Sequence, residues 1–456
     1  MDNNQPIGSV DISESSVMIY ITPGPLFDNF DPKKKYDNVI SEVIAMEIHS
    51  SIESFYRYGF VVIPDRIGMR ESLSLTGNEI ITVRYSNSVA TSLVPPKSIH
   101  FNIYDMEEVA LNNEYKDRYT NKAIKLHLIE APFFLTYNMK VWSKVYGKDY
   151  GTAQETLKLN KIFENHLIND LKITNTNIVS LDLNDMSTDM YWINPSWKSQ
   201  KMFSYLLQFA RDTNNNGNVK FFTTSDVFED KIILNLKSVN QMFDVKNLYQ
   251  YTIVNVGPLE QSGLDVGQRA PKSLNHIIDF KLKSYDLLSL TSGLPGGYIY
   301  NRDYLSNKRF IQLDNYASTN RTEKYFSNNA LWLEDISAWD NAAYTIGSMP
   351  INLAKAYLNN KIIDQKYQLK CLADCYLNHE RNCGDKVNII FPPAGGAIDN
   401  AKYIDEHMSG DWIIQEMIDV ITNNRGYTNI TFIKDSFYYD HRMPGVEPIQ
   451  KITFKE

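Results

Sequence analysis

The stretch DWIIQEMIDVITNNRGYTNITFIKDS, residues 411–436, carries the clearest information on how this chain folds. The apolar spacing of its first half fits a helix, but four isoleucines and a valine favour a strand, because β-branched side chains suit a pleated surface. Asn423-Asn424-Arg425-Gly426 is a suitable hairpin turn, and Ile430 and Phe432 then alternate with polar residues. The residues favour a β-hairpin, and a helix followed by a strand remains the alternative.

Composition narrows the class of protein. With 456 residues the chain exceeds one ordinary core, so two to four compact units are expected. A hydrophobic content of 43% is that of a folded protein and not of a disordered tail. The net charge of −8, with no basic run longer than Lys33–Lys35, argues against a sequence-specific nucleic-acid binder. Three cysteines are too few for a disulfide framework, which points to a reducing cytosol.

Targeting segments give little signal. The opening residues MDNNQPIGSVDISESS are polar and do not resemble a signal peptide. No apolar run approaches the ~20 residues that a membrane-spanning helix needs. We therefore expect no membrane insertion.

Alternating apolar residues predict strands in the first third of the chain. They occur in ESLSLTGNEIITVRY (71–85), SIHFNIYDM (98–106) and AIKLHLIE (123–130). Such alternation is typical of antiparallel strands with one buried face, so a small barrel or sandwich is expected.

From residue 151 the pattern changes to that of helices. Thr152 and Glu155 predict a capping box before the helical stretch KLNKIFENHLINDL. Asn194 and Pro195 predict the start of a second helix, which ends before Asn214-Asn215-Asn216-Gly217. VKFFTT and KIILNL then predict a hairpin-like return to strands.

Four residues are of the types that bind zinc, but their spacing does not suit a zinc site. Cys371, Cys375, His379 and Cys383 are zinc-type ligands set four apart. On a helix the outer two would lie about 18 Å apart. On a strand the first two cysteines would lie about 13 Å apart. We therefore expect buried or half-buried free thiols.

Other site motifs are incomplete. Asp212, Asn214, Asn216 and Gly217 begin like a calcium loop, but Thr223 stands where the twelfth-position glutamate is required, so a helix-to-strand turn is expected. No GxSxG, HExxH, P-loop or dinucleotide pattern occurs. The remaining histidines are scattered: His49, His100, His127, His166, His276, His407 and His441. We predict no catalytic, cofactor-binding or metal-binding residues and no cofactor, although a glycosidase needs only two carboxylates and stays an alternative.

Five places along the chain resemble the baseplate hub proteins of tailed phages, whose fold is shared by the hub part of VgrG-type secretion spikes. The resemblance covers about residues 70–240 and 366–436. It is carried by GNEIITVRYSN; by FNIYDMEEV followed by KLHLIEAPFF; by LNKIFENHLI leading to WINPSWKSQKMFSYLLQFARD and GNVKFFTTSD; by CGDKVNIIFPP; and by SGDWIIQEMIDVI with YTNITFIKDS.

The resemblance implies an α+β, mainly β fold with two tail-tube-like antiparallel β-barrel domains, connecting helices and a loop-rich middle segment. The expected units are a flexible N-terminal arm (1–15), a first tube-like β-barrel domain (16–150), a connecting region with a helix pair and a hairpin (151–245), a loop-rich mixed insertion (246–365), a second tube-like β-barrel domain (366–440) and a C-terminal tail (441–456).

The resemblance also implies a structural role and no enzymatic activity. Such hubs are homotrimers that join the sixfold tail tube to a threefold central spike or fibre and form part of the DNA ejection channel. Expected partners are a second and third copy, the tail tube protein, a spike or tail-tip protein, the tape measure protein and other baseplate proteins. DNA would pass through the lumen without sequence-specific binding. The expected location is the virion tail or baseplate, after assembly in the host cytoplasm.

Two other classes of function stay open from the sequence. One is a hub of a related machine, such as a contractile injection machine, a siphophage tail tip or a portal-proximal ring. The other is a hydrolase that degrades glycans or peptidoglycan. A hydrolase would require two carboxylates, or a Ser/Cys–His pair, that converge in a cleft.

Overall fold

The structure, a computed structural model, describes part of the chain. The described residues are 14–22, 38–40, 43–65, 79–87, 94–110, 122–138, 140–149, 154–173, 179–214, 217–246, 249–253, 275–283, 297–303, 308–314, 332–335, 367, 369–391, 409–422 and 424–434.

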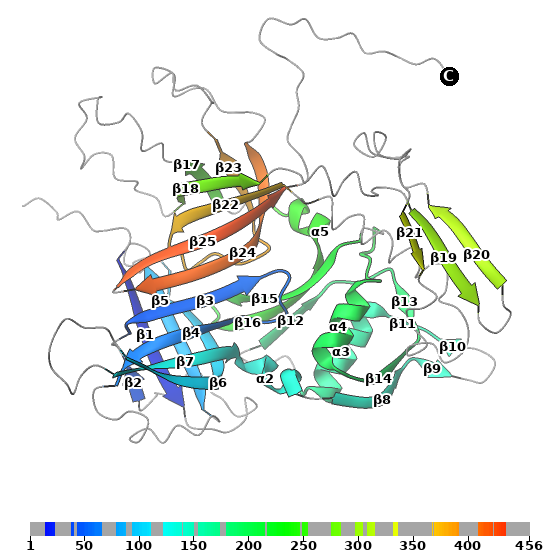
Figure 1. Ribbon diagram of the computed structural model, residues 1–456, viewed down its shortest axis with the longest axis horizontal. Helices are drawn as coiled ribbons and strands as arrows, with labels where there is room; N and C mark the ends of the chain where they lie inside the picture. Colours follow the sequence, from blue (N-terminus) through cyan, green and yellow to red (C-terminus); the bar gives the residue numbers. More distant parts are fainter. Residues whose placement is uncertain are drawn as a thin grey trace, which may run out of the picture.

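Thirteen strands form one continuous sheet, the largest sheet among the described residues (Figure 1). Its order is β2-β1-β5-β6-β7-β4-β3-β24-β23-β17-β18-β22-β25. The strands are β1 (Ser15–Thr22), β2 (Asn38–Ile40), β3 (Ala45–Ser51), β4 (Tyr58–Pro64), β5 (Ile80–Asn87), β6 (Lys97–Ala110), β7 (Lys122–Glu130), β17 (Tyr249–Ile253), β18 (His276–Lys283), β22 (Leu369–Tyr376), β23 (Lys386–Ile390), β24 (Gly410–Thr422) and β25 (Arg425–Lys434).

The large sheet consists of an N-terminal group of strands, β1–β7, and a C-terminal group, β17, β18 and β22–β25. Strand β24 joins the two groups, because its two ends pair with different neighbours. Residues 410–413 pair with β23, and residues 416–422 pair with β3. Strand β25 pairs with β24 on both sides of a register shift at Gln415. The Gln415 carbonyl accepts the N–H of Ile52 at 2.9 Å, so the irregular residue is itself tied to the N-terminal group.

The predicted hairpin at residues 411–436 is confirmed, and the helical alternative for its first half is wrong. Ile430 and Phe432 of β25 are buried, as their alternation predicts. The mainly β class is also confirmed. The two separate barrel domains are not, because the strands belong to one continuous sheet in which β25 pairs back with β24.

The predicted strands of the N-terminal group are confirmed where the structure describes them. Ile99, Phe101 and Ile103 of β6 are buried, and so are Ile124, Leu126 and Leu128 of β7. The first half of the stretch 71–85 and its Gly77-Asn78 turn lie outside the described residues. Burial of one apolar face provides the core of this group.

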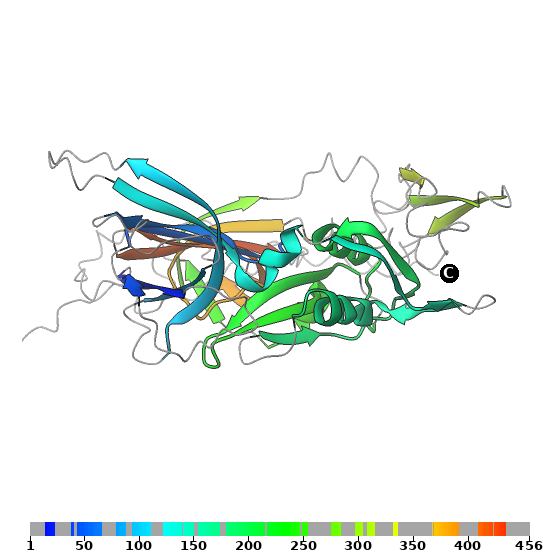
Figure 2. The same ribbon diagram turned by 90° about the horizontal axis from the view of Figure 1, so that it is seen from below.

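Between β7 and β17 the chain forms a layer of helices and short strands, hereafter the inserted layer. Figure 2 shows its helices beside the large sheet. Its elements are α2 (Ala131–Asn138), β8 (Lys140–Tyr146), β9 (Lys148–Asp149), β10 (Gln154–Glu155), β11 (Leu157–Lys158), α3 (Leu159–Asn165) with a following π-helical turn (His166–Asp170), β12 (Val179–Leu183), β13 (Asp189–Met190), β14 (Trp192–Lys198), α4 (Ser199–Leu207), β15 (Val219–Asp226), β16 (Lys231–Ser238) and α5 (Val239–Asp244).

Both predicted helices exist, but both predicted starts are wrong. Glu155 lies in β10, and the N-cap of α3 is Lys158, which makes no side-chain cap. Pro195 lies in the irregular strand β14, which pairs with β8, and α4 begins only at Ser199. Pairing with a strand from elsewhere in the chain therefore overrides the local start signal. The apolar residues of α4 and of the turn that follows it are buried: Met202, Phe203, Leu206, Phe209 and Ala210.

Aromatic packing forms the core of the inserted layer. Phe163 of α3 stacks on Phe203 of α4 with ring centroids 4.8 Å apart, and both contact Phe221 of β15 edge-on or tilted. The predicted hairpin of VKFFTT and KIILNL is confirmed as the antiparallel pair β15–β16. This core binds the helices to β15, which faces the large sheet.

Several strands lie in the segment 246–365. Strands β17 and β18 join the large sheet, and β17 pairs in parallel with β23. A separate small sheet consists of β19 (Gly297–Asp303), β20 (Lys308–Asp314) and β21 (Trp332–Asp335). The proposed domain boundaries in this segment stay a prediction. No helix among the described residues is long and apolar enough to cross a membrane.

Gly426 should be intolerant of a side chain. It lies at the hairpin end against β1, where a Cβ atom would meet Ser15 Oγ at 2.2 Å and Leu377 Cδ2 at 2.7 Å. We expect Gly426→Ala to lower the free energy of unfolding by about 1–3 kcal/mol, as overpacking does. Urea unfolding measures this. The control is the exposed neighbouring residue: Arg425→Ala should change the free energy of unfolding by less than about 0.5 kcal/mol. Equal losses of stability in the two variants would contradict the close packing at Gly426.

Candidate functional site

A buried ion pair lies where the large sheet meets the inserted layer. Arg57 precedes β4 and Glu130 ends β7, and their side chains are 2% and 0% exposed. The Arg57 backbone N–H and Nε each donate to the Glu130 carboxylate at 3.0 Å, and Nη2 donates to it as well. A buried carboxylate held by several donors is satisfied in geometry and charge, whereas removal of either partner leaves an uncompensated charge.

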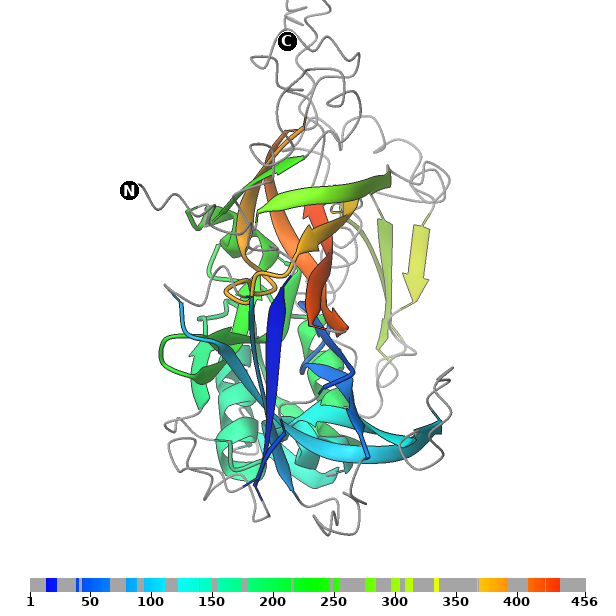
Figure 3. The ribbon, with the colours of Figure 1, turned by 90° about the vertical axis from the view of Figure 1, so that its left-hand side faces the viewer.

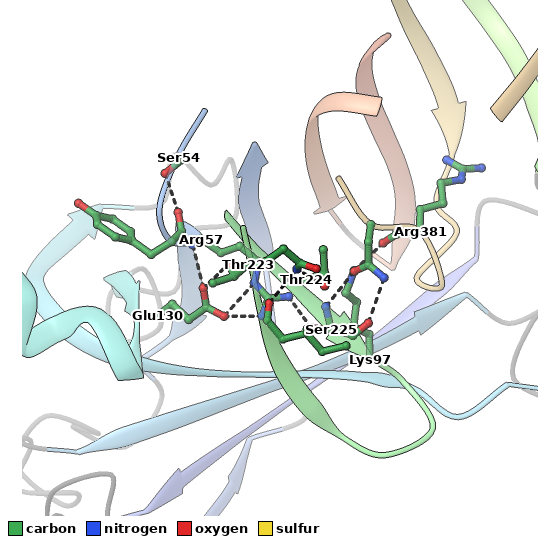
Figure 4. A network of polar contacts seen from close by, with 12 residues as sticks. Ser54, Arg57, Lys97, Glu130, Thr223, Thr224, Ser225 and Arg381 are labelled. Atoms are coloured by element: carbon green, nitrogen blue, oxygen red, sulfur yellow. Dashed lines mark hydrogen bonds and ion pairs between the residues drawn. The ribbon is translucent and has the colours of Figure 1, made fainter. Parts of the chain in front are cut away.

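The inserted layer is tied to this ion pair by β15. Thr223 donates its hydroxyl to Glu130 at 2.8 Å, and the Arg57 guanidinium donates to the hydroxyl of Ser225 (Figure 4). Both hydroxyls are buried. The pair therefore connects three elements, β4, β7 and β15, and its loss would loosen the contact between the two layers.

The same junction extends to the loop between β22 and β23. The Asn382 side chain accepts from the Ser225 N–H and donates to the Ser225 carbonyl, each at 3.0 Å, as a neighbouring strand would. Lys97, at the start of β6, donates to the Arg381 carbonyl at 2.7 Å. The N-terminal group, the inserted layer and the C-terminal group thus meet in one polar network (Figure 4).

Burial shifts the titration of groups around this network. It lowers the pKa of Lys97 to about 8 and raises the pKa of Asp385 to about 7. The Asp385 carboxyl accepts from the Asn382 N–H at 2.9 Å, which holds the loop against β23. These groups are engaged in holding backbone, so the network acts as a structural junction.

A second buried cluster has the geometry of a serine–histidine–aspartate triad. His166 Nε2 lies 2.9 Å from the hydroxyl of Ser199, the first residue of α4, and His166 Nδ1 lies 2.9 Å from Asp170 Oδ2. The Tyr146 hydroxyl also lies 2.8 Å from Nδ1 and donates to Asp170. Burial lowers the pKa of His166, against the opposing effect of Asp170.

Burial argues against catalysis by this cluster. The side chains of Ser199 and His166 are both 0% exposed, and the His166 ring packs edge-on against Phe203 in the core of the inserted layer. A nucleophile must meet a substrate carbonyl, which requires an open approach. The cluster is better explained as a satisfied polar group that fixes α3 against α4.

One hollow of about 540 Å³ lies between β3, α4 and β24. It brings two carboxylates, Glu53 and Glu416, to one place, as the glycosidase alternative would require. Glu53 is already bound to Lys220 at 2.9 Å. A paired carboxylate does not match the proton donor that such a mechanism needs, so the hollow does not favour a hydrolase.

The four zinc-type residues are not assembled into a site. Cys371 and Cys375 point into the C-terminal core from β22, and burial raises the pKa of each to about 12. His379 Nδ1 accepts from the Asn87 N–H, while Nε2 lies 3.1 Å from the Pro95 carbonyl. The prediction of buried free thiols is confirmed, Cys383 included.

The described residues at the start of the calcium-like stretch, Asp212 to Asn214, form a turn. Asp212 Oδ1 accepts from the Asn214 N–H at 2.9 Å, and Oδ2 accepts from the Ser238 hydroxyl at 2.7 Å. Asn216 lies outside the described residues. The carboxylate is thus used to connect the end of the α4 region with the end of β16, as the predicted turn requires.

The sequence did not single out the residues of the junction, although one of them carried a signal. Glu130 continues the inward alternation of Ile124, Leu126 and Leu128, so its parity in β7 predicts a buried carboxylate. Arg57 and Asn382 lie outside strands, and nothing in the linear order pairs them with β7 or β15.

Comparison with known proteins gives a fold. No family model matches the chain, and no curated protein sequence is similar to it. The tail protein of Neisseria meningitidis MC58 is 8% identical over 92% of this chain and 97% of its own, with a TM-score of 0.50. The 43 kDa tail protein of prophage MuSo2 from Shewanella oneidensis is 8% identical over 93% and 97%, with a TM-score of 0.47.

A component of the Escherichia coli type VI secretion system, described as structurally similar to the T4 tail proteins gp27 and gp5, is 8% identical over 90% of this chain and 76% of its own, with a TM-score of 0.46. At such identities a likeness defines the fold only. Over nearly its whole length the chain has the fold of the Neisseria meningitidis tail protein, and the resemblance predicted from the sequence is confirmed at the level of the fold.

Removing one partner of the buried ion pair should be strongly destabilising. We expect Glu130→Gln to lower the free energy of unfolding by about 3–5 kcal/mol, because the Arg57 charge stays buried without a counter-charge. Adding Arg57→Met should recover part of the loss. The matched control is Asp182→Asn, which breaks the exposed pair with Lys237 and should cost at most about 1 kcal/mol. Equal losses in urea unfolding would contradict the junction.

Ser199 should behave as a structural residue. We expect Ser199→Ala to cost about 1–3 kcal/mol of stability, because His166 Nε2 then lacks its buried partner. A fluorophosphonate probe should leave Ser199 of the native protein unmodified, as read by peptide mass spectrometry. Stoichiometric labelling of Ser199 would instead show an accessible, activated nucleophile.

Proposed function

We propose that this chain is a structural hub subunit of a phage tail or of a related injection machine. The observation that carries the proposal is the fold likeness to the tail protein of Neisseria meningitidis, which covers 92% of this chain and 97% of the other. A likeness over nearly the full length of both chains supports the proposal better than a likeness limited to one barrel would. A non-enzymatic role is part of the proposal.

The shared strand supports a role in assembly. Because β24 pairs with β3 and β23, the N-terminal and C-terminal groups of strands are held in a fixed relation. We propose that each group serves as one tube-like unit, so that three chains form a ring with six such units. A ring of this kind joins a sixfold tube to a threefold spike or fibre, and closed symmetry satisfies strand edges that a lone subunit would expose.

The proposed partners follow from that place in the tail. They are two further copies of the chain, the tail tube protein, a central spike or tail-tip protein, the tape measure protein and other baseplate proteins. DNA would pass through the lumen of the ring without sequence-specific contacts, and the net charge of −8 suits such passage. The protein would assemble in the host cytoplasm and reside in the virion tail.

The mass of the purified protein in solution tests this proposal. Light scattering behind a sizing column, at several concentrations and with or without the tail tube protein of the same phage, should find a species of about three times 52.6 kDa. A trimer that forms only when the tube protein is present also agrees with the hub proposal. A monomer in every condition, with no tube binding, would contradict the hub proposal.

A further inference from the structure

Strand β6 changes its buried face at one residue. Ile103 pairs with Leu128, but the next pair is Asp105 with His127, so Tyr104 is an extra residue on this strand. Before the bulge the odd-numbered residues of β6 face the core, and after it Asp105 and Glu107 lie on the outer face. The bulge therefore places both carboxylates on the same face as His127 of β7.

Three metal-type ligand atoms converge there. One ligand atom from each of Asp105, Glu107 and His127 lies within 4.8 Å of the other two. His127 Nε2 lies 3.4 Å from Glu107 Oε1. In the described structure this nitrogen is shielded from solvent and makes no hydrogen bond of normal geometry. Asp105 Oδ1 accepts from the Met106 N–H at 2.8 Å, which orients its carboxylate.

The local charge balance leaves room for a cation. Lys125 is opposite Glu107 in the register, yet its ammonium lies 4.3 Å from the centre of the Phe60 ring. The ion pair that the described structure records for Glu107 is with His127, which carries a charge only when protonated. Two carboxylates thus share this site with an imidazole. Among the described residues, neither carboxylate forms an ion pair with a lysine or an arginine.

The spacing agrees with metal coordination. Ligand atoms at about 2.1 Å from a tetrahedral ion lie roughly 3.4 Å from one another, which is the separation of His127 Nε2 and Glu107 Oε1. A ligand atom of Asp105 lies within 4.8 Å of both. One imidazole nitrogen with two carboxylate oxygens suits zinc and similar borderline transition metals, with water in the remaining position.

We propose that Asp105, Glu107 and His127 form a binding site for one divalent transition-metal ion of the zinc type. The site lies on the hairpin of β6 and β7, which extends away from the rest of the sheet in two views (Figures 2 and 3). A bound ion would connect the two strands at the bulge, where the hydrogen-bond ladder is interrupted. This inference is independent of the hub proposal.

The experiment uses the full chain without an affinity tag, stripped of metal by a chelator. Titration with Co²⁺, followed by its visible absorption, and with Zn²⁺, followed by calorimetry, should give one saturable site per chain. His127→Gln should abolish that site, and Asp105→Asn and Glu107→Gln should each weaken binding at least tenfold. Asp105 and Glu107 are exposed and His127 is half-buried on the outer face of the sheet. None of the three is a core residue, so the variants should keep the circular dichroism spectrum of the parent.

A second histidine–carboxylate pair provides the matched control. His49 Nε2 lies 2.6 Å from Glu47 Oε1 on β3, and among the described residues no third metal-type ligand joins this pair. His49→Gln should leave the stoichiometry and affinity unchanged. The bulge has a simpler role as well, since it turns Asp105 and Glu107 out of the core. If that role is its whole purpose, the parent shows no saturable binding, or His127→Gln binds as the parent does, and either result overturns the proposal.

Discussion

Strand β24 hydrogen-bonds with β23 through its first residues, with β3 through its last residues and with β25 along most of its length. This sharing aligns the strands of the two halves within one sheet. A one-residue slip of β24 would turn its buried residues to the opposite face in both groups at once. The register is therefore specified from both sides, and the bulge at Gln415 absorbs the difference between the two pairings.

The polar junction complements the shared strand. Sheet hydrogen bonds hold the two groups of strands edge to edge, whereas Arg57 and Glu130 hold the inserted layer against their faces. Asn382 adds the C-terminal loop to the same contact. The hydrogen bonds between these polar side chains form in only one arrangement of the layers. The contact is therefore more selective than a purely apolar contact would be.

Local features of the fold could be predicted from the sequence, and non-local ones could not. The hairpin of β24 and β25 and the inward residues of β6 and β7 follow from alternation and turn chemistry. The pairing of β24 with β3 joins segments near opposite ends of the chain, and no local sequence pattern predicts it. For this reason the expected two barrels are one continuous sheet.

The same division holds for the candidate sites. The sequence correctly predicts Cys371 and Cys375 as buried thiols, because residues four apart on a strand lie about 13 Å apart, too far to share an ion. The group around His127 was missed, since it depends on the bulge at Tyr104, which reverses the faces of β6. The cluster of Ser199 and His166 was missed because its members come from separate helices.

Amide hydrogen exchange along β24, followed by mass spectrometry, tests most directly whether one strand unites the two halves. Peptides covering residues 410–413 and 416–422 should show equally slow exchange after correction for intrinsic rates, because both ends open only when the whole sheet unfolds. Fast exchange at one end with strong protection at the other would contradict the account. The two groups of strands would then be independent units that merely touch.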